Sequence, residues 1–206
     1  MNDRRPVPFI PQFQLQYHAA LTLQACPDDP TIQENLFTIV AANLATDLNQ
    51  FESALHFDNC TFDLGVQRIN DLWQLIESGV EVNPYVMFGT MIHTVQDFYA
   101  HSNWVELQVD QSPVPTWDLV LSSLPADIVS GTFFLDSPKE CGPNAPTHAQ
   151  LNKDSPDSEE GQKLVPSGPN QGKTLFDVAF AAALQATEVQ FDRLEAVIGV
   201  RSADTS

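Results

Sequence analysis

Basic residues are scarce in this sequence. Lysine and arginine together number nine, against 27 aspartates and glutamates, and the formal net charge is −18. A field of that sign repels phosphate polyanions and anionic membranes, and it attracts cations. The charge therefore disfavours nucleic acid as a partner, whereas a cluster of bound metal ions would return positive charge to one place.

Cysteines and long apolar runs are also few. Cys26, Cys60 and Cys141 are odd in number and show no CxxC spacing, so we expect free thiols rather than a disulfide framework. No apolar run approaches the roughly 18 residues of a membrane span, and no apolar signal-peptide region follows the first arginines. The sequence predicts a soluble protein, cytoplasmic or exported by a route without an ordinary signal peptide.

Length and hydrophobicity predict one helical domain. The chain has 206 residues, of which 43% are apolar, and this is enough to bury a single core. Helical periodicity covers residues 12–26, 31 to before 56, 62–79, 83–104 and 174–199. We predict an all-α single-domain bundle of about five to seven helices. The domain spans 12–199, between a lead (1–11) and a tail (200–206), and contains a long Pro/Gly-rich loop (136–173).

Local signals place the ends of these helices. Thr31 and Glu34 have the spacing of a capping box. Asn83-Pro84 combines an N-cap residue with proline at the first helical position. Gly79 and Gly199 are expected to end their helices, and Asp177 occupies the capping position behind Thr174 at the start of the last one.

Two regions raise particular questions. The stripe of the second helix, Val40, Leu44, Phe51 and Leu55, also contains Asp47. A carboxylate on a core-facing stripe is costly unless it is paired or bound to a metal ion. Residues 111–135 leave two alternatives open, a short helix near 117–121 or a strand near 128–135.

The residues that carry chemistry begin with His93, Asp97 and His101, which recur every four positions. On a helix such residues share one face, and imidazole and carboxylate are ordinary zinc ligands. For the first two members alone, structural histidines and a surface aspartate are the favoured explanation, but the third member favours a metal site. The other histidines, His18, His56 and His148, each suit either a metal-binding or a structural role.

The segment Gly89–Glu106, with the pattern HTVQDFYAH inside it, resembles the central motif of HET-C-type proteins, which look like relatives of the zinc-dependent phospholipase C and fungal zinc-nuclease superfamily. Supporting pieces follow in the expected order: His18, Asn43–Asp47, His56–Asn59, Leu151–Asp154 and the Ala-rich last helix. The resemblance implies an all-α fold with a multi-zinc cleft that holds two or three Zn²⁺ ions.

Carried over residue by residue, the resemblance implies that Asp97 bridges two zinc ions. Asp47, His56 and His93 would complete one of them, and His18 would bind the other. His101 would hold a third zinc together with Glu106 or His148. Glu106 reaches the site only if the helix breaks near residues 102–103, and Asp58 is a reserve ligand for His56. Asp47 or Asp58 would also act as the catalytic group that orients or deprotonates the attacking water.

The function implied is a phospholipase C-type phosphodiester hydrolase that acts on phospholipid headgroups at a membrane surface, as a toxin or cell-death effector. One alternative is a zinc nuclease, which the acidic charge disfavours. Another is a non-enzymatic interaction module stabilised by zinc. It is favoured by the start of the chain, Met-Asn-Asp, where the superfamily's enzymes have a ligating N-terminal tryptophan. Phe98, Tyr99 and Trp104 would line a lipid approach or, as we favour, pack in the core.

Overall fold

The computed structural model describes residues 15–79, 82–133 and 141–204. In this part of the chain there are helices, turns and isolated β-bridges but no strands, so the predicted all-α fold is confirmed. The elements in chain order are α1 (Leu15–Ala25), α2 (Pro30–Thr46), α3 (Ser53–His56), η1 (Asp58–Cys60), α4 (Phe62–Ser78), α5 (Pro84–His101), α6 (Trp104–Gln108), η2 (Leu121–Ser123), α7 (His148–Leu151) and α8 (Leu175–Asp204).

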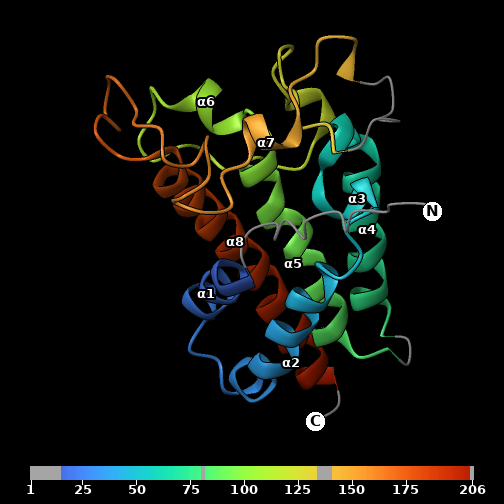
Figure 1. The fold of residues 1–206 in the computed structure, drawn as a ribbon. Coiled ribbons are helices and arrows are strands. Elements are labelled where there is room, and N and C mark those ends of the chain that lie inside the picture. The colour runs from blue at the N-terminus through green and yellow to red at the C-terminus, as the bar shows by residue number, and fades with distance from the viewer. Residues whose placement is uncertain (1–14, 80–81, 134–140, 205–206) are drawn as a thin grey trace, which may run out of the picture.

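Helix α5 is the central element. It packs against α2, α3, α4 and α8, and α1 lies against both α2 and α8 (Figure 1). Thirteen of its 18 residues are buried, and five of these are polar or charged: His93, Thr94, Gln96, Asp97 and His101. At Gly89 a Cβ atom would lie 2.3 Å from the Ile39 carbonyl oxygen of α2, so glycine is required for this close approach. The C-terminal half of α5 is thereby placed beside the end of α2.

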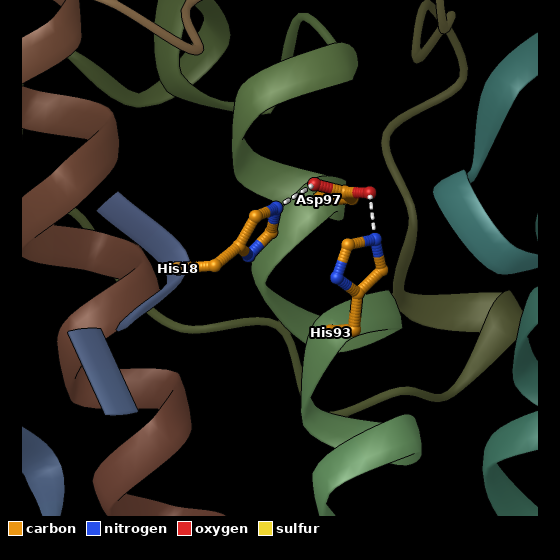
Figure 2. A group of neighbouring side chains, drawn as sticks. All are labelled: His18, His93 and Asp97. Atoms are coloured by element: carbon orange, nitrogen blue, oxygen red, sulfur yellow. Dashed lines mark ion pairs between the residues drawn. The ribbon is translucent and has the colours of Figure 1, made fainter. Parts of the chain in front are cut away.

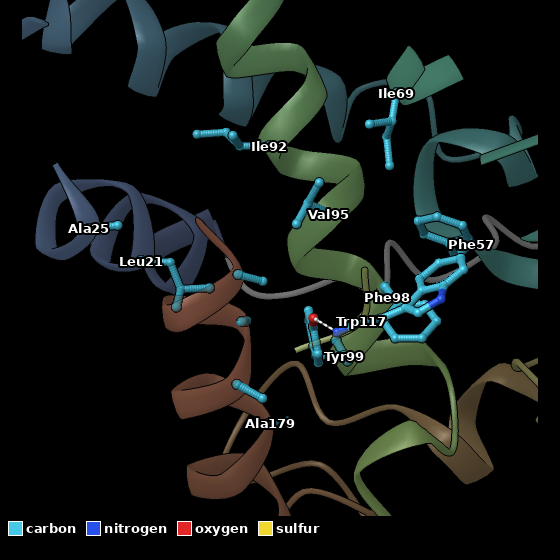
Figure 3. Packing of buried hydrophobic residues seen from close by; sticks show 14 of the residues in the cluster. Leu21, Ala25, Phe57, Ile69, Ile92, Val95, Phe98, Tyr99, Trp117 and Ala179 are labelled. Carbon is cyan, nitrogen blue, oxygen red and sulfur yellow. Dashed lines mark hydrogen bonds between the residues drawn. The ribbon is translucent and has the colours of Figure 1, made fainter. Parts of the chain in front are cut away.

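Aromatic side chains fill the core around this half of α5. The rings of Phe98 and Trp117 stack with centroids 4.5 Å apart, and Phe57 packs edge-on against both (Figure 3). The Tyr99 hydroxyl accepts a hydrogen bond from the Trp117 backbone at 2.9 Å. Phe98, Tyr99 and Trp104 are at most 5% exposed. They belong to the core and do not line a lipid approach.

Several predicted helix ends are confirmed. Asn83 caps α5 by accepting hydrogen bonds from the Tyr85 and Val86 amides. Gly79 ends α4 with φ 68°, in the left-handed region that glycine adopts without strain. At the start of α8, the Thr174 amide donates to Asp177 Oδ2 and the Asp177 amide donates to Thr174 Oγ1.

Other predicted boundaries are wrong. The N-cap of α2 is Asp29, whose carboxylate accepts from the Ile32 amide, and Thr31 lies inside the first turn behind Pro30. The helix ends at Thr46, so it does not carry the predicted stripe through Phe51, which is 77% exposed. Because α2 ends before His56, Asp47 and His56 can face the same site, as the predicted ligand set requires.

The remaining corrections lie nearer the C-terminus. Helix α5 ends at His101 rather than near Trp104, because Ser102 is extended (φ −100°, ψ 164°). Helix α8 continues through Gly199 to Asp204, because this glycine keeps helical backbone angles. In place of the two alternatives for 111–135, the described part of that region has the short 3-10 turn η2 and two isolated bridges, at Ser130 and Thr132. The lead (1–11) and residues 136–140 of the predicted loop lie outside the described residues.

The expectation of free thiols is wrong for two of the three cysteines. Cys60 and Cys141 form a disulfide with a Cα–Cα distance of 5.3 Å, and Cys26 is free. The two cysteines are 81 residues apart in sequence, and the fold brings both sulfur atoms close to the Ser130 carbonyl oxygen. The disulfide ties the turn that carries Asp58 to the segment that precedes His148.

Candidate metal centre

Nine buried histidine and aspartate side chains gather around the C-terminal half of α5. None of them is more than 6% exposed. They form four overlapping triplets, and within each triplet one ligand atom per residue lies within 4.8 Å of the others. We call one part the first cluster, made of His18, Asp47, His56, His93 and Asp97. The second cluster is made of Asp58, His101, His148 and Asp154.

The first cluster is centred on the Asp97 carboxylate. Its Oδ2 lies 2.7 Å from His56 Nδ1 and 3.0 Å from His93 Nε2, and its Oδ1 lies 3.2 Å from His18 Nε2. Figure 2 shows the rings of His18 and His93 approaching the two oxygens from α1 and from α5. Asp47, at the C-cap of α2, completes the cluster with Oδ1 3.6 Å from His93 Nε2.

The second cluster lies one turn further along α5. His101 Nε2 is 2.9 Å from Asp154 Oδ1, and His101 Nδ1 is 3.6 Å from Asp58 Oδ1. The same Asp58 oxygen is 3.0 Å from His148 Nδ1. Asp97 joins the two clusters, because it also forms a triplet with His101 and Asp154. Four sequence segments therefore meet at the end of α5.

Side-chain amides hold the outer nitrogen of two histidines in the first cluster, His18 and His93. His18 Nδ1 lies 2.7 Å from Gln96 Oε1, and His93 Nδ1 lies 3.1 Å from Asn43 Oδ1. The Asn43 amide donates to Gln96 Oε1 at 3.0 Å, so the two holding groups support each other. Amide oxygens only accept, so each ring carries a proton on Nδ1 and turns Nε2 towards Asp97. Fixing a ligand's tautomer in this way is typical of the outer shell of metal sites.

The contact between His93 and Asp97 lacks a positive charge. Burial lowers the pKa of His93 to about 3, against the opposing effect of Asp97, so this ring is neutral near pH 7. Its unprotonated Nε2 then faces Asp97 Oδ2 at 3.0 Å, which places two acceptors in contact. Both oxygens of the buried Asp47 carboxylate and Oδ2 of Asp154 also lack a hydrogen-bond partner among the described residues. Such an arrangement is unfavourable unless a cation lies between these atoms.

Burial and neighbouring charges also shift the pKa values of Asp47, Asp97 and His101. Burial raises the pKa of Asp47 to about 7. Burial would also raise the pKa of Asp97, but His93 and His101 outweigh it and hold the pKa well below its ordinary value. Burial opposes a charge on His101, yet Asp154, Asp97 and Asp58 raise the pKa of its imidazole well above 6.5. The donor set and its unpaired atoms therefore fit a bound metal ion.

The structure places seven of the eight predicted metal ligands in the two clusters. The exception is Glu106. The chain does break at Ser102 as the prediction required, but the Glu106 carboxylate points to Lys153 Nζ, 2.9 Å away. Asp58 lies between two histidines of the second cluster, in the position of a ligand. Sequence reasoning missed the role of Asp154; its one signal was the Leu151–Asp154 stretch, which carried no predicted role of its own.

Comparison with known families gives one match. The VWA7 N-terminal domain family matches residues 15–125, more than half of the chain. The chain belongs to the VWA7 N-terminal domain family. The matched range contains the whole first cluster together with Asp58 and His101, and it ends before His148 and Asp154.

Searches of curated proteins and of solved structures found no match. Among the residues that the structure describes, every helix is too short or too polar to cross a membrane.

Proposed function

We propose that this member of the VWA7 N-terminal domain family is a zinc-dependent phosphodiester hydrolase of phospholipase C type that acts on phospholipid headgroups. The observation that supports it most is the convergence of three histidine nitrogens on both oxygens of one buried carboxylate, Asp97. This arrangement agrees with the bridging role that the resemblance to HET-C-type proteins implies for Asp97.

The donor atoms favour zinc over other common divalent ions. Five histidines and four aspartates supply nitrogen and oxygen donors together. Calcium and magnesium prefer sites made of oxygen atoms alone, whereas zinc accepts imidazole and carboxylate in the same site. His18, Asp47, His56, His93 and Asp97 would hold zinc in the first cluster, and the four residues of the second cluster would hold a further ion.

The chain's own residues prepare the centre for hydrolysis. Zinc bound there would lower the pKa of a water molecule and neutralise charge on a phosphoryl group. Asp97 belongs to one triplet with His18 and His93 and to another with His101 and Asp154, so it links the two clusters. Both oxygens of Asp47 lack hydrogen bonds among the described residues, so Asp47 can bind the metal or accept a proton from the attacking water. Gln96 and Asn43 keep the rings of His18 and His93 in the required tautomer.

The charge of the chain favours a zwitterionic lipid over a polyanion. With a net charge of −18, long-range attraction to nucleic acid or to anionic lipid is unfavourable. A phosphocholine headgroup carries no net charge and escapes this repulsion. The resemblance to HET-C-type proteins further leads us to propose a role as a toxin or cell-death effector.

The test is headgroup release from phosphatidylcholine vesicles by protein of measured zinc content. We expect release of phosphocholine by wild type, and its loss in His93→Ala and Asp97→Asn together with loss of zinc. Asp71→Asn, an exposed aspartate on α4, is the matched control. If zinc-loaded protein releases no headgroup, the proposed phospholipase C-type activity is refuted. Nicking of single-stranded DNA at low salt would indicate the nuclease instead.

A second candidate is a zinc-stabilised interaction module without catalysis. The observation that favours it is the burial of the centre, since none of the nine side chains exceeds 6% exposure. A buried, fully ligated site is typical of structural zinc. If removal of zinc unfolds the protein, and the zinc-loaded protein never cleaves phosphodiesters, this candidate replaces the enzyme.

A further inference from the structure

Lys153 is a fully buried lysine beside the second cluster. Its exposure is 0%, and its ammonium group donates to three acceptors: Ser102 O at 2.9 Å, Leu151 O at 2.8 Å and Glu106 Oε1 at 2.9 Å. A lysine ammonium has three donor hydrogens, so all of them are used. Ser102 is the C-cap of α5 and Leu151 is the last residue of α7. Lys153 therefore joins the ends of the two helices that carry His101 and His148.

The residues on either side of Lys153 both touch the second cluster. The Asn152 amide lies 3.0 Å from His148 Nε2, and Asp154 Oδ1 lies 2.9 Å from His101 Nε2. The Lys153 backbone amide also donates to Ala100 O, at 3.1 Å, within the last turn of α5. Any movement of Lys153 would thus move a ligand and the group that orients another ligand.

We propose that Lys153, paired with Glu106, is a positioning residue that holds Asn152 and Asp154 against the second cluster. It acts through its neighbours and contacts none of the nine ligand side chains by its ammonium group. Glu106 supplies the negative charge that makes a buried ammonium tolerable. The inference rests on the proposed binding of metal at this centre, and it does not depend on hydrolysis.

The test compares zinc affinities of the intact protein and five single variants. Competition with a chromophoric chelator gives two dissociation constants, which His18→Ala and His148→Ala assign to the first and second clusters. Lys153→Met and Glu106→Gln should each weaken the second constant by about 10–100-fold, the usual effect of losing an outer-shell partner, and leave the first unchanged. Glu77→Gln breaks an exposed ion pair with Arg193 between α4 and α8 and should change neither constant.

The double variant Lys153→Met/Glu106→Leu separates positioning from simple stability. Replacing a buried ion pair by apolar residues of similar volume is often neutral for folding. We expect its metal-free stability to return towards that of wild type while the second constant stays weak, because the contacts to the ends of α5 and α7 are still missing. Recovery of both properties would overturn the proposal.

Other outcomes would also overturn it. If Glu106 were itself a ligand, Lys153→Met would remove a competing cation and tighten the second constant. Equal weakening of both constants would indicate general damage to the fold. A wild type that binds only one zinc would likewise refute the role of Lys153. Absence of phospholipase activity would refute the proposed function and leave this inference standing.

Discussion

Asp47 should destabilise the metal-free protein, and replacing it with asparagine should relieve that cost. Its carboxylate is 6% exposed and neither oxygen has a hydrogen-bond partner among the described residues. Burial raises its pKa from 3.8 to about 7. The folded state therefore binds this proton more tightly than the unfolded chain does. The resulting contribution to stability is complete below pH 3.8 and is lost as the pH rises through about 7.

The size of the effect follows from the same two pKa values. Each pKa unit corresponds to about 1.36 kcal/mol, so the full loss from low pH to about pH 8 is roughly 4 kcal/mol. Between about pH 5 and about pH 8 the loss is roughly 3 kcal/mol. Asp47→Asn keeps the shape of the side chain and cannot ionise. Its free energy of unfolding relative to wild type should therefore rise by this amount across that interval.

The assay is urea denaturation in the presence of a chelator at both pH values, with Asp71→Asn as an exposed control. With excess zinc, wild type should become more stable than Asp47→Asn. Zinc at about 100-fold its Kd adds roughly 2.7 kcal/mol to the free energy of unfolding of a protein that binds it. Asp47→Asn should gain much less. If the metal-free variant is no more stable than wild type at about pH 8, Asp47 does not carry the strain we assign to it.

Three further predictions concern the scaffold, each measured by denaturant unfolding. Asp29→Ala should cost about 1 kcal/mol by removing the N-cap of α2; no loss would mean that the cap lies elsewhere. Gly89→Ala should cost about 1–3 kcal/mol, because the new methyl meets Ile39 O at 2.3 Å. Gly199→Ala should raise the free energy of unfolding by up to about 1 kcal/mol, because there is open space around this helical glycine. If both glycine substitutions changed the stability in the same direction, the packing described for Gly89 and Gly199 would be wrong. Reducing the disulfide should cost about 4 kcal/mol by loop entropy, and Cys26→Ser should cost little.

Features that depend on neighbours in sequence could be predicted, and features that depend on distant contacts could not. Asn83 and Gly79 were found because capping uses the residue itself and the next few amides. The Thr31 capping box failed because Asp29 offers the same chemistry two residues earlier, with Pro30 in the position that suits a first turn. Asp29 and Thr31 are both suitable N-cap residues, and the sequence alone did not show which of them caps the helix.

The candidate centre shows the same division. The spacing of His93, Asp97 and His101 places them on one face of a single helix, and local geometry suffices for that inference. Asp154 could not be found in this way, because its contact with His101 joins residues 53 positions apart. The prediction that Glu106 is a ligand failed because its partner, Lys153, is also distant in sequence. The predicted break in the helix occurred, but a buried lysine competes for its carboxylate.

Charge balance limits how many ions the centre can hold. Four of its nine residues are aspartates, so with neutral histidines it carries four negative charges in a buried site. Uncompensated buried charge is costly. In the metal-free protein, protons on histidines supply the balance: burial opposes them, but the surrounding aspartates raise the pKa values of His18, His101 and His148. Two divalent ions would neutralise the four carboxylates and displace these protons, whereas a third would leave an excess of positive charge. Charge balance therefore favours two ions over three in the proposed metal centre.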